Sequence, residues 1–203
     1  MNRTTPIESI AEHSEFRRLD SISDVAVDLR YATANNFIGC DMYAGHDCAW
    51  LHRDAADALS RAVASLRAVR PDLRLLVLDA LRPQRVQELM WASLEGTDLR
   101  KYLASPDRGS IHSFGMAVDV TLIDAEGLEL DMGTAFDDLT ERSHPALESV
   151  LLRRGEITTM QVANRQILRD VMSANSWQGI STEWWHFDCG DRLLVRKNYS
   201  RIL

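Results

Sequence analysis

The run Met116-Ala117-Val118-Asp119-Val120-Thr121-Leu122-Ile123 decides the fold that we expect for this chain. Its apolar and β-branched residues are typical of a strand buried in the centre of a sheet. Asp119 interrupts the run, and a buried carboxylate has to be paired, hydrogen-bonded or bound to a metal. The run therefore predicts a central strand with a functional group on it.

The segments around this run predict helices and further strands. Apolar residues recur every three or four positions in 54–69, which indicates an amphipathic helix that stops before Pro71. Because strands and helices do not alternate regularly, we expect an α+β fold with a central, mostly antiparallel sheet flanked by helices. The other expected elements are helices at 84–94 and 160–174, the second with Met160, Ala163, Ile167 and Val171 facing inward, and strands at 25–29, 73–78 and 182–187.

The charge balance excludes several kinds of partner. The 203 residues include 23 basic and 30 acidic side chains, which gives a formal net charge of −7. Without a run of Lys or Arg, this balance argues against nucleic acid and against an anionic membrane surface as partners. No stretch resembles a secretory signal or a membrane span, so we expect a cytoplasmic protein.

No repeat or linker divides the sequence, so we expect one domain over residues 1–203, with a polar N-terminal tail at 1–14. A chain of this length can bury a core without a metal or disulfides, so a metal would serve chemistry. Cys40, Cys48 and Cys189 are predicted to be free thiols, and a Cys40–Cys48 bridge is the alternative.

Two short segments, 110–119 and 183–186, concentrate side chains that bind metals. His112, Asp119 and His186 would supply the three protein ligands of a catalytic zinc site. Glu183 is placed to take a proton from water and pass it to a leaving amine. In a regular strand Glu183 and His186 would face opposite sides, so a bulge or a strand end must lie between them if they serve one site.

These residues also have simpler interpretations. A lone His such as His112 is often a surface residue, and paired tryptophans such as Trp184 and Trp185 usually belong to a core. Arg82 follows the expected strand at 73–78, where it could stabilise an oxyanion. An exposed salt bridge from Arg82 to Asp79 or Glu88 is the alternative.

Taken together, the segments resemble the zinc-dependent D-alanyl-D-alanine dipeptidases of the vancomycin-resistance type. The family motif S-x-H-x-x-G-x-A-x-D is matched by Ser110, His112, Gly115, Ala117 and Asp119, and the motif E-W-W-H by 183–186. Further ordered matches lie at 28–33, 35–37, 39, 82–83, 132–134, 136–137 and 141–144. Leu81, Phe114 and Ala135 stand where the family usually has other residues. The resemblance therefore does not determine the selectivity of the substrate pocket.

The resemblance implies an enzyme that binds one zinc ion per chain and takes a small dipeptide substrate. It also implies a role for each of eight residues: His112, Asp119 and His186 as zinc ligands, Glu183 as general base and then acid, Arg82 at the tetrahedral intermediate, Tyr31 and Asp137 at the substrate ammonium, and Ser110 at its carboxylate. Two alternatives remain, a peptidoglycan carboxypeptidase or endopeptidase with the same metal set, and a zinc-stabilised binding module without catalysis.

Overall fold

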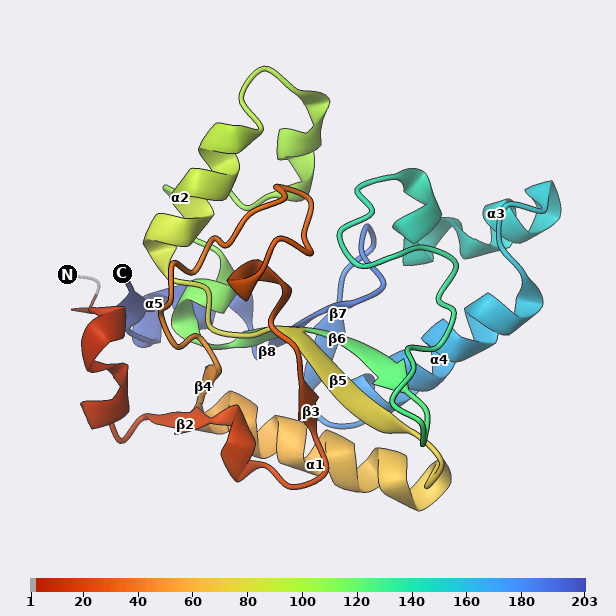
Figure 1. Ribbon diagram of the computed structural model, residues 1–203, viewed down its shortest axis with the longest axis horizontal. Coiled ribbons are helices and arrows are strands. Elements are labelled where there is room, and N and C mark those ends of the chain that lie inside the picture. The colour runs from red at the N-terminus through yellow and green to blue at the C-terminus, as the bar shows by residue number, and fades with distance from the viewer. Residues whose placement is uncertain (1–2) are drawn as a thin grey trace.

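The computed structural model describes residues 3–203, and a five-stranded sheet lies at its centre (Figure 1). The strand order is β3 (Ala26–Val27), β5 (Arg74–Asp79), β6 (Ala117–Ile123), β8 (His186–Cys189) and β7 (Trp177–Gly179). Within this sheet only the β3–β5 pair is parallel, and the other three pairs are antiparallel. The predicted α+β fold with a mostly antiparallel central sheet is confirmed.

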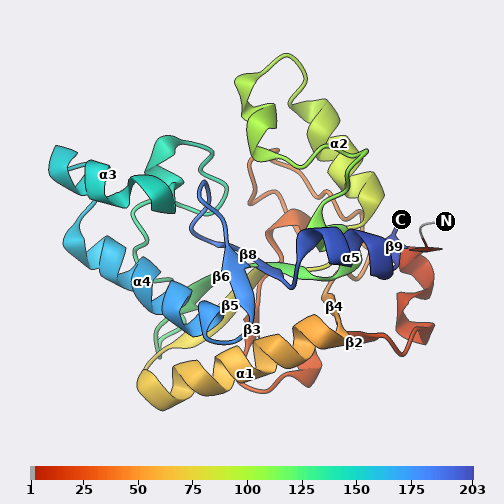
Figure 2. The ribbon, with the colours of Figure 1, turned by 180° about the vertical axis from the view of Figure 1, so that it is seen from behind.

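Helices α1 (Arg53–Val69) and α4 (Thr159–Ser173) cover one face of this sheet (Figures 1 and 2). Alternate residues of β6, Val118, Val120 and Leu122, belong to the buried cluster that includes residues of both helices. Because side chains alternate between the two faces of a strand, Asp119 and Thr121 point to the other face. The functional group predicted on the central strand therefore lies on the side away from α1 and α4.

The second face is covered by the irregular segment 28–48 and by α2 (Gln84–Ser93), which lies above the sheet in Figure 1. Tyr31, Tyr43, Val86 and Met90 form a buried cluster between them. Tyr31 of this cluster lines the site described below.

The remaining elements are short. They are β1 (Thr4–Thr5) paired with β9 (Arg201–Ile202), β2 (Phe16–Arg18) paired with β4 (Trp50–His52), α3 (Glu148–Arg154), α5 (Arg192–Asn198), and the 3-10 helices η1 (Ile7–Glu12), η2 (Leu19–Ser21), η3 (Arg30–Ala32), η4 (Asp98–Tyr102), η5 (Ile111–Phe114), η6 (Glu141–Ser143) and η7 (Pro145–Leu147).

The expected polar tail at 1–14 is wrong where the structure describes it, from residue 3 onward. Ile7 and Ile10 of η1 are buried in a cluster with Phe16 and Ile202, and β1 adds a strand to the C-terminal β9. Two isoleucines three positions apart bury one side of this short helix, so the segment is part of the folded protein. Residues 1 and 2 lie outside the described residues.

The inward face predicted for α4 is confirmed at Val171, which is buried, and at Ile167, which packs against the core, but it is wrong at Met160 and Ala163. Met160 is 62% exposed and Ala163 is exposed, whereas Arg165, Leu168 and Met172 are buried. Arg165 turns inward because its guanidinium donates hydrogen bonds to the carbonyls of Met132 and Arg142. A polar residue on the buried side shifts the helix face away from the one that an apolar pattern predicts.

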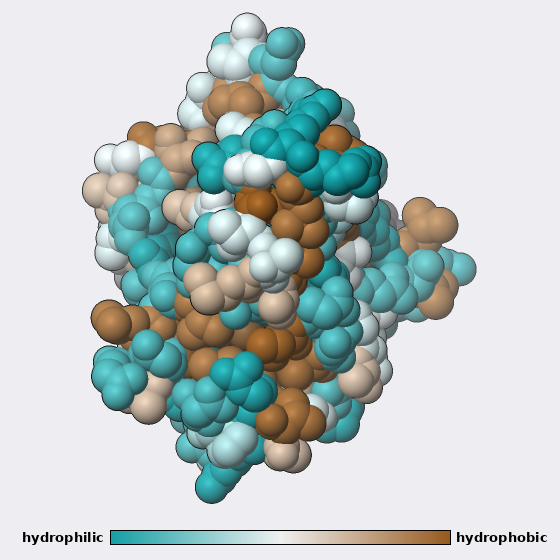
Figure 3. Space-filling view, turned by 90° about the vertical axis from the view of Figure 1, so that its right-hand side faces the viewer, coloured by the Kyte–Doolittle hydropathy of each residue, from teal (hydrophilic) through white to brown (hydrophobic). Residues whose placement is uncertain are grey.

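All three cysteines are free, as predicted, so the alternative Cys40–Cys48 bridge is not formed. Within residues 3–203, no helix combines the length and the apolar character that crossing a membrane requires. On the side of the molecule seen in Figure 3, hydrophobic residues gather in the middle of the face and hydrophilic residues surround them.

Candidate metal centre and substrate pocket

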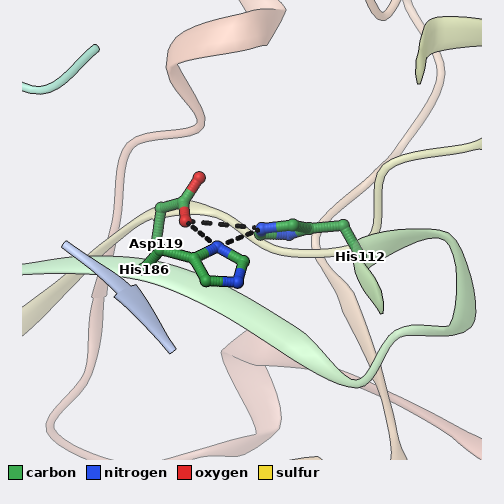
Figure 4. Close-up of side chains that lie close together, drawn as sticks. All are labelled: His112, Asp119 and His186. Carbon is green, nitrogen blue, oxygen red and sulfur yellow. Dashed lines mark hydrogen bonds and ion pairs between the residues drawn. The ribbon is translucent and has the colours of Figure 1, made fainter. Parts of the chain in front are cut away.

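Three potential metal ligands converge from three elements on the second face of the sheet (Figure 4). His112 comes from η5, Asp119 from β6 and His186 from β8, and the β6–β8 register places Asp119 opposite His186. His186 Nδ1 lies 2.9 Å from Asp119 Oδ1 and 3.1 Å from His112 Nε2, and His112 Nε2 lies 3.4 Å from Asp119 Oδ1. Ligand atoms at tetrahedral positions about 2.1 Å from a zinc ion would be about 3.4 Å apart, so the spacing suits a metal.

Hydrogen bonds at the far side of each imidazole determine which nitrogen faces the centre. His112 Nδ1 is 2.8 Å from the carbonyl oxygen of Ala80, which can only accept, so the Nε2 of a neutral ring carries the lone pair. His186 Nε2 is 2.9 Å from Asp188 Oδ1, which likewise leaves Nδ1 free. Three electron-rich atoms thus face one another, an arrangement that a cation stabilises.

The electrostatics of this cluster favour a positive charge at its centre. Burial disfavours the ionised form of Asp119, but His112 and His186 hold the pKa of its carboxyl well below the usual range. Burial also disfavours a charge on His186, and Asp188 and Asp119 nevertheless raise its pKa. The donor set, two imidazoles and a carboxylate, is one that zinc prefers.

Arg82 lies buried beside this centre. Its Nε is 2.8 Å from Asp79 Oδ2, its Nη1 is 3.1 Å from Gln87 Oε1, and its Nη2 is 3.4 Å from Asp119 Oδ2. The salt bridge to Asp79 that the sequence left as an alternative does form, but it is buried rather than exposed. It orients the guanidinium, whose carbon lies 4.9 Å from the centre of the Tyr31 ring.

Tyr31 and Asp137 meet although 106 positions separate them in the sequence. The Tyr31 hydroxyl donates to Asp137 Oδ1 at 2.8 Å, and the amide of Phe37 donates to Oδ2 at 3.5 Å. Burial raises the pKa of Asp137 to about 8, against the opposing effect of the hydrogen bond from Tyr31. A carboxylate in this position is stabilised by any cation that reaches it.

Glu183 lies in the irregular segment between β7 and β8. The expected strand at 182–187 is shorter than predicted, because β8 begins only at His186. The start of β8 therefore lies between Glu183 and His186, so both side chains can face the same site. Burial raises the pKa of Glu183 to about 7, which is suited to accepting and returning a proton near neutral pH.

All eight residues that the sequence singled out line one pocket with a volume of about 260 Å³: Tyr31, Arg82, Ser110, His112, Asp119, Asp137, Glu183 and His186. Such a volume is close to the lower limit for small-molecule sites, about 300 Å³. The convergence was not visible in any single segment, because these residues come from seven parts of the chain.

Sequence reasoning missed the basic residues of this pocket. Arg108, Arg192 and Arg196 line it, and Lys101 does so as well. Burial lowers the pKa of Arg196, and the neighbouring charges of Arg108 and Arg192 lower it further. Arg192 and Arg196 are four positions apart on α5, a spacing that puts both on one side of a helix, but nothing in the sequence relates α5 to the site.

Comparisons with known proteins agree with the geometry. Residues 12–202 match the model of the peptidase M15 family, described as D-Ala-D-Ala dipeptidase. The D-alanyl-D-alanine dipeptidase of Escherichia coli strain K12 is 37% identical over 81% of this chain and 79% of its own. The enzyme of the same name from Enterococcus faecium is 32% identical over 85% of this chain and 90% of its own.

Among solved structures, the LdcB LD-carboxypeptidase has a weaker likeness, with a TM-score of 0.42 and 15% identity over 93% of this chain and 75% of that one. The two dipeptidase matches, by contrast, span most of both chains, and the family match at 12–202 includes the segments that build the pocket. The chain therefore belongs to the D-Ala-D-Ala dipeptidase family of M15 peptidases and is a metallopeptidase.

Proposed function

We propose that this protein is a zinc dipeptidase that hydrolyses free D-alanyl-D-alanine to two molecules of D-alanine. The observation that carries the proposal is the polarity of the pocket. Asp137 and Tyr31 lie in one part of its wall, Arg108, Arg192 and Arg196 are basic, and the candidate metal ligands belong to the same cavity. A zwitterionic dipeptide matches this distribution of charge.

His112, Asp119 and His186 would hold the zinc ion, one per chain. When bound there, zinc would act as a Lewis acid that polarises the peptide carbonyl and lowers the pKa of water to about 7. The residues of the chain supply the remaining functions.

Glu183 is the proposed general base. Its carboxylate takes a proton from the attacking water and then delivers it to the nitrogen of the leaving D-alanine, so the carboxylate is restored at the end of the cycle. A pKa of about 7 lets Glu183 act in both directions near neutral pH.

Arg82 is the proposed donor to the oxyanion that develops on the peptide carbonyl. Its guanidinium is held by Asp79 and Gln87 before substrate binds, so little reorganisation is needed during the reaction. The contact of Nη2 with Asp119 places it beside the proposed metal ligands.

The two substrate termini are assigned by charge. Asp137, hydrogen-bonded by Tyr31, would bind the ammonium group, which would also stabilise its ionised form. Ser110 would help to hold the carboxylate, and Arg108, Arg192 and Arg196 would favour it electrostatically. A dipeptide bound in this way pairs its ammonium with Asp137 and its carboxylate with the basic residues, so neither charge of the substrate is left unpaired.

The alternatives differ at defined residues. A peptidoglycan carboxypeptidase or endopeptidase would face an acylated nitrogen at Asp137, which would leave this carboxylate without a cation. A binding module without catalysis would not need Glu183, which is present in the pocket and is not one of the three proposed ligands. A cytoplasmic location stays a prediction from the sequence.

The test is to measure the zinc content of the purified protein and then the release of D-alanine from D-Ala-D-Ala, with and without a chelator. We expect release that the chelator abolishes and that added zinc restores. N-acetyl-D-Ala-D-Ala is the matched substrate, and equal rates on both compounds would favour the peptidoglycan enzymes. A zinc-loaded protein that is inert on a panel of D-containing dipeptides would refute the proposal.

A further inference from the structure

One hydrogen bond joins two walls of the pocket that are otherwise built separately. Tyr102 Oη lies 3.0 Å from Nε2 of His144, and their rings meet edge to face with centroids 5.6 Å apart. Tyr102 ends η4, whereas His144 follows η6, 42 residues later. We call this contact the Tyr102–His144 bridge.

Tyr102 itself lines the pocket, whereas His144 lies outside the lining in a segment that reaches it. Tyr102 and its neighbours Leu103 and Ala104 line the pocket from one segment, and Asp137 and Leu139 line it from the other. Within residues 3–203, no other hydrogen bond or salt bridge connects 84–109 with 131–147. The bridge is therefore the one polar link between these two described segments, which otherwise share apolar packing, since Leu103 and Phe136 both pack against the buried cluster that contains Tyr31.

Each wall is anchored at its own base. On the Tyr102 side, Gln87 Nε2 donates to the carbonyl of Ala104 at 2.8 Å, which ties the wall to α2. On the other side, the Ser143 hydroxyl donates to the carbonyl of Asp138 at 2.6 Å, and buried Arg165 donates to the carbonyl of Arg142. Because both bases are fixed, opening between the walls would occur at the bridge itself.

The bridge ties the Tyr102 segment to the segment that carries Asp137. His144 follows Asp137 by seven positions in the same segment, and the carboxylates whose charges act on Tyr102 are Glu141, Glu183 and Asp138. Burial raises the pKa of Tyr102, and Glu141 and Glu183 raise it further, which keeps its hydroxyl protonated as a donor. Both side chains are only half-buried, so the contact can break and re-form as substrate enters.

We propose that the Tyr102–His144 bridge closes the pocket over the substrate ammonium and thereby excludes peptides extended at the amino terminus. The inference rests on the proposed dipeptidase function. Asp137 attracts the ammonium by charge, and the bridge adds a steric limit, because a further residue would have to pass between the two walls. Tyr102 and His144 are thus specificity-determining residues rather than catalytic ones.

The test compares D-Ala-D-Ala with Gly-D-Ala-D-Ala, scored by D-alanine release, in Tyr102→Phe, Tyr102→Ala and His144→Ala. We expect the preference for the dipeptide, as a ratio of kcat/KM, to fall about three- to tenfold in Tyr102→Phe and His144→Ala, the range for the loss of one hydrogen bond. Tyr102→Ala, which also removes the ring, should lose at least as much. Tyr199→Phe is the control, because it removes a partly exposed tyrosine hydrogen bond, to Asp54, away from the pocket.

A merely structural contact would lower the rates on both substrates together and leave their ratio unchanged, and that result would overturn the proposal. Hydrogen exchange of the amides at 99–104 and 138–144 gives a second, activity-independent readout. We expect exchange there to rise severalfold in Tyr102→Phe and His144→Ala, but not in Tyr199→Phe. If the unaltered protein cleaves neither peptide, the proposed function fails, and unchanged exchange in the variants would show separately that the bridge does not hold the walls together.

Discussion

Replacing Asp137 by Asn should make the protein more stable and a poorer enzyme. Asp137 accepts hydrogen bonds from Tyr31 at Oδ1 and, at 3.5 Å, from the amide of Phe37 at Oδ2; the one carbonyl oxygen of Asn can keep the shorter bond from Tyr31 and loses the longer one. What the substitution removes is a carboxylate whose burial raises its pKa from 3.8 to about 8. At neutral pH the unfolded chain ionises this carboxyl freely, whereas burial opposes its ionisation in the folded protein, so the carboxyl lowers the free energy of unfolding, and Asn carries no such cost.

The sign and size follow from proton linkage. Between pH 3.8 and about pH 8 the Asp137 carboxyl is protonated to a larger extent in the folded protein than in the unfolded chain. The free energy of unfolding therefore falls as the pH rises through that window. At about 1.4 kcal/mol for each pH unit, the upper limit at pH 7 is about 4 kcal/mol. Single stabilising substitutions usually gain about 0.5–2 kcal/mol, and we expect Asp137→Asn in the upper half of that range.

The assay is thermal unfolding of both proteins at pH 4, 6 and 8 with a chelator present, since a bound divalent cation would itself favour the ionised carboxylate. A gain of 1–2 kcal/mol corresponds to a rise in Tm of about 2–8 °C for a chain of this size. The rise should be largest at pH 8 and absent at pH 4. Asp138→Asn makes the same chemical change one residue away and serves as the control.

The effect of Asp137→Asn on catalysis is measured with the zinc-loaded proteins. Losing a charge-assisted hydrogen bond to the ammonium should lower kcat/KM on D-Ala-D-Ala by about 10- to 150-fold, mostly through KM. A variant whose Tm at pH 8 equals that of the unaltered protein, or whose Tm gain is the same at pH 4 and pH 8, would show that Asp137 is not a strained carboxylate. An unchanged KM would show that Asp137 does not bind the substrate ammonium.

Three further substitutions test the other parts of the site. Glu183→Gln should retain zinc, measured by metal analysis, while kcat falls about 10²- to 10⁴-fold; near-normal turnover would exclude Glu183 as the base. Arg82→Ala should lower kcat/KM about 10²- to 10³-fold as an oxyanion donor is lost, and should also lower Tm because Asp79 stays buried without its partner; an unchanged kcat would remove Arg82 from the mechanism. Asp188→Asn should weaken zinc binding about 10- to 100-fold in competition with a chelator, because Asp188 orients His186, whereas the exposed Asp107→Asn should not; equal affinities would contradict that role.

The parts of the site that the sequence predicts well are those set by short-range rules. An acidic residue inside an apolar strand pattern identified Asp119, and the spacing of Glu183 from His186 required the strand end that the structure has at His186. The strand at 73–78 and the helix at 54–69 correspond to β5 and α1 within two residues at each end. In each of these cases the information lies within one element.

The parts that could not be predicted depend on contacts between distant segments. The N-terminal residues looked like a tail because their two buried isoleucines are few, and their partners Phe16 and Ile202 lie at opposite ends of the chain. The inward side of α4 was misplaced at Met160 and Ala163, because Arg165 is buried by hydrogen bonds to two carbonyls elsewhere in the sequence. No periodicity within a helix encodes such partners.

The proposed function gives a reason for the basic residues of the pocket, which no local sequence pattern predicted. A dipeptide carries both of its charges on one molecule, so it can pair Asp137 and the arginines while losing its translational freedom only once. Hydrolysis divides the original termini between two molecules of D-alanine, and each product then pairs only one end of the pocket. In the proposed mechanism each D-alanine is therefore held by fewer ion pairs than the dipeptide, which would promote release after the peptide bond is broken.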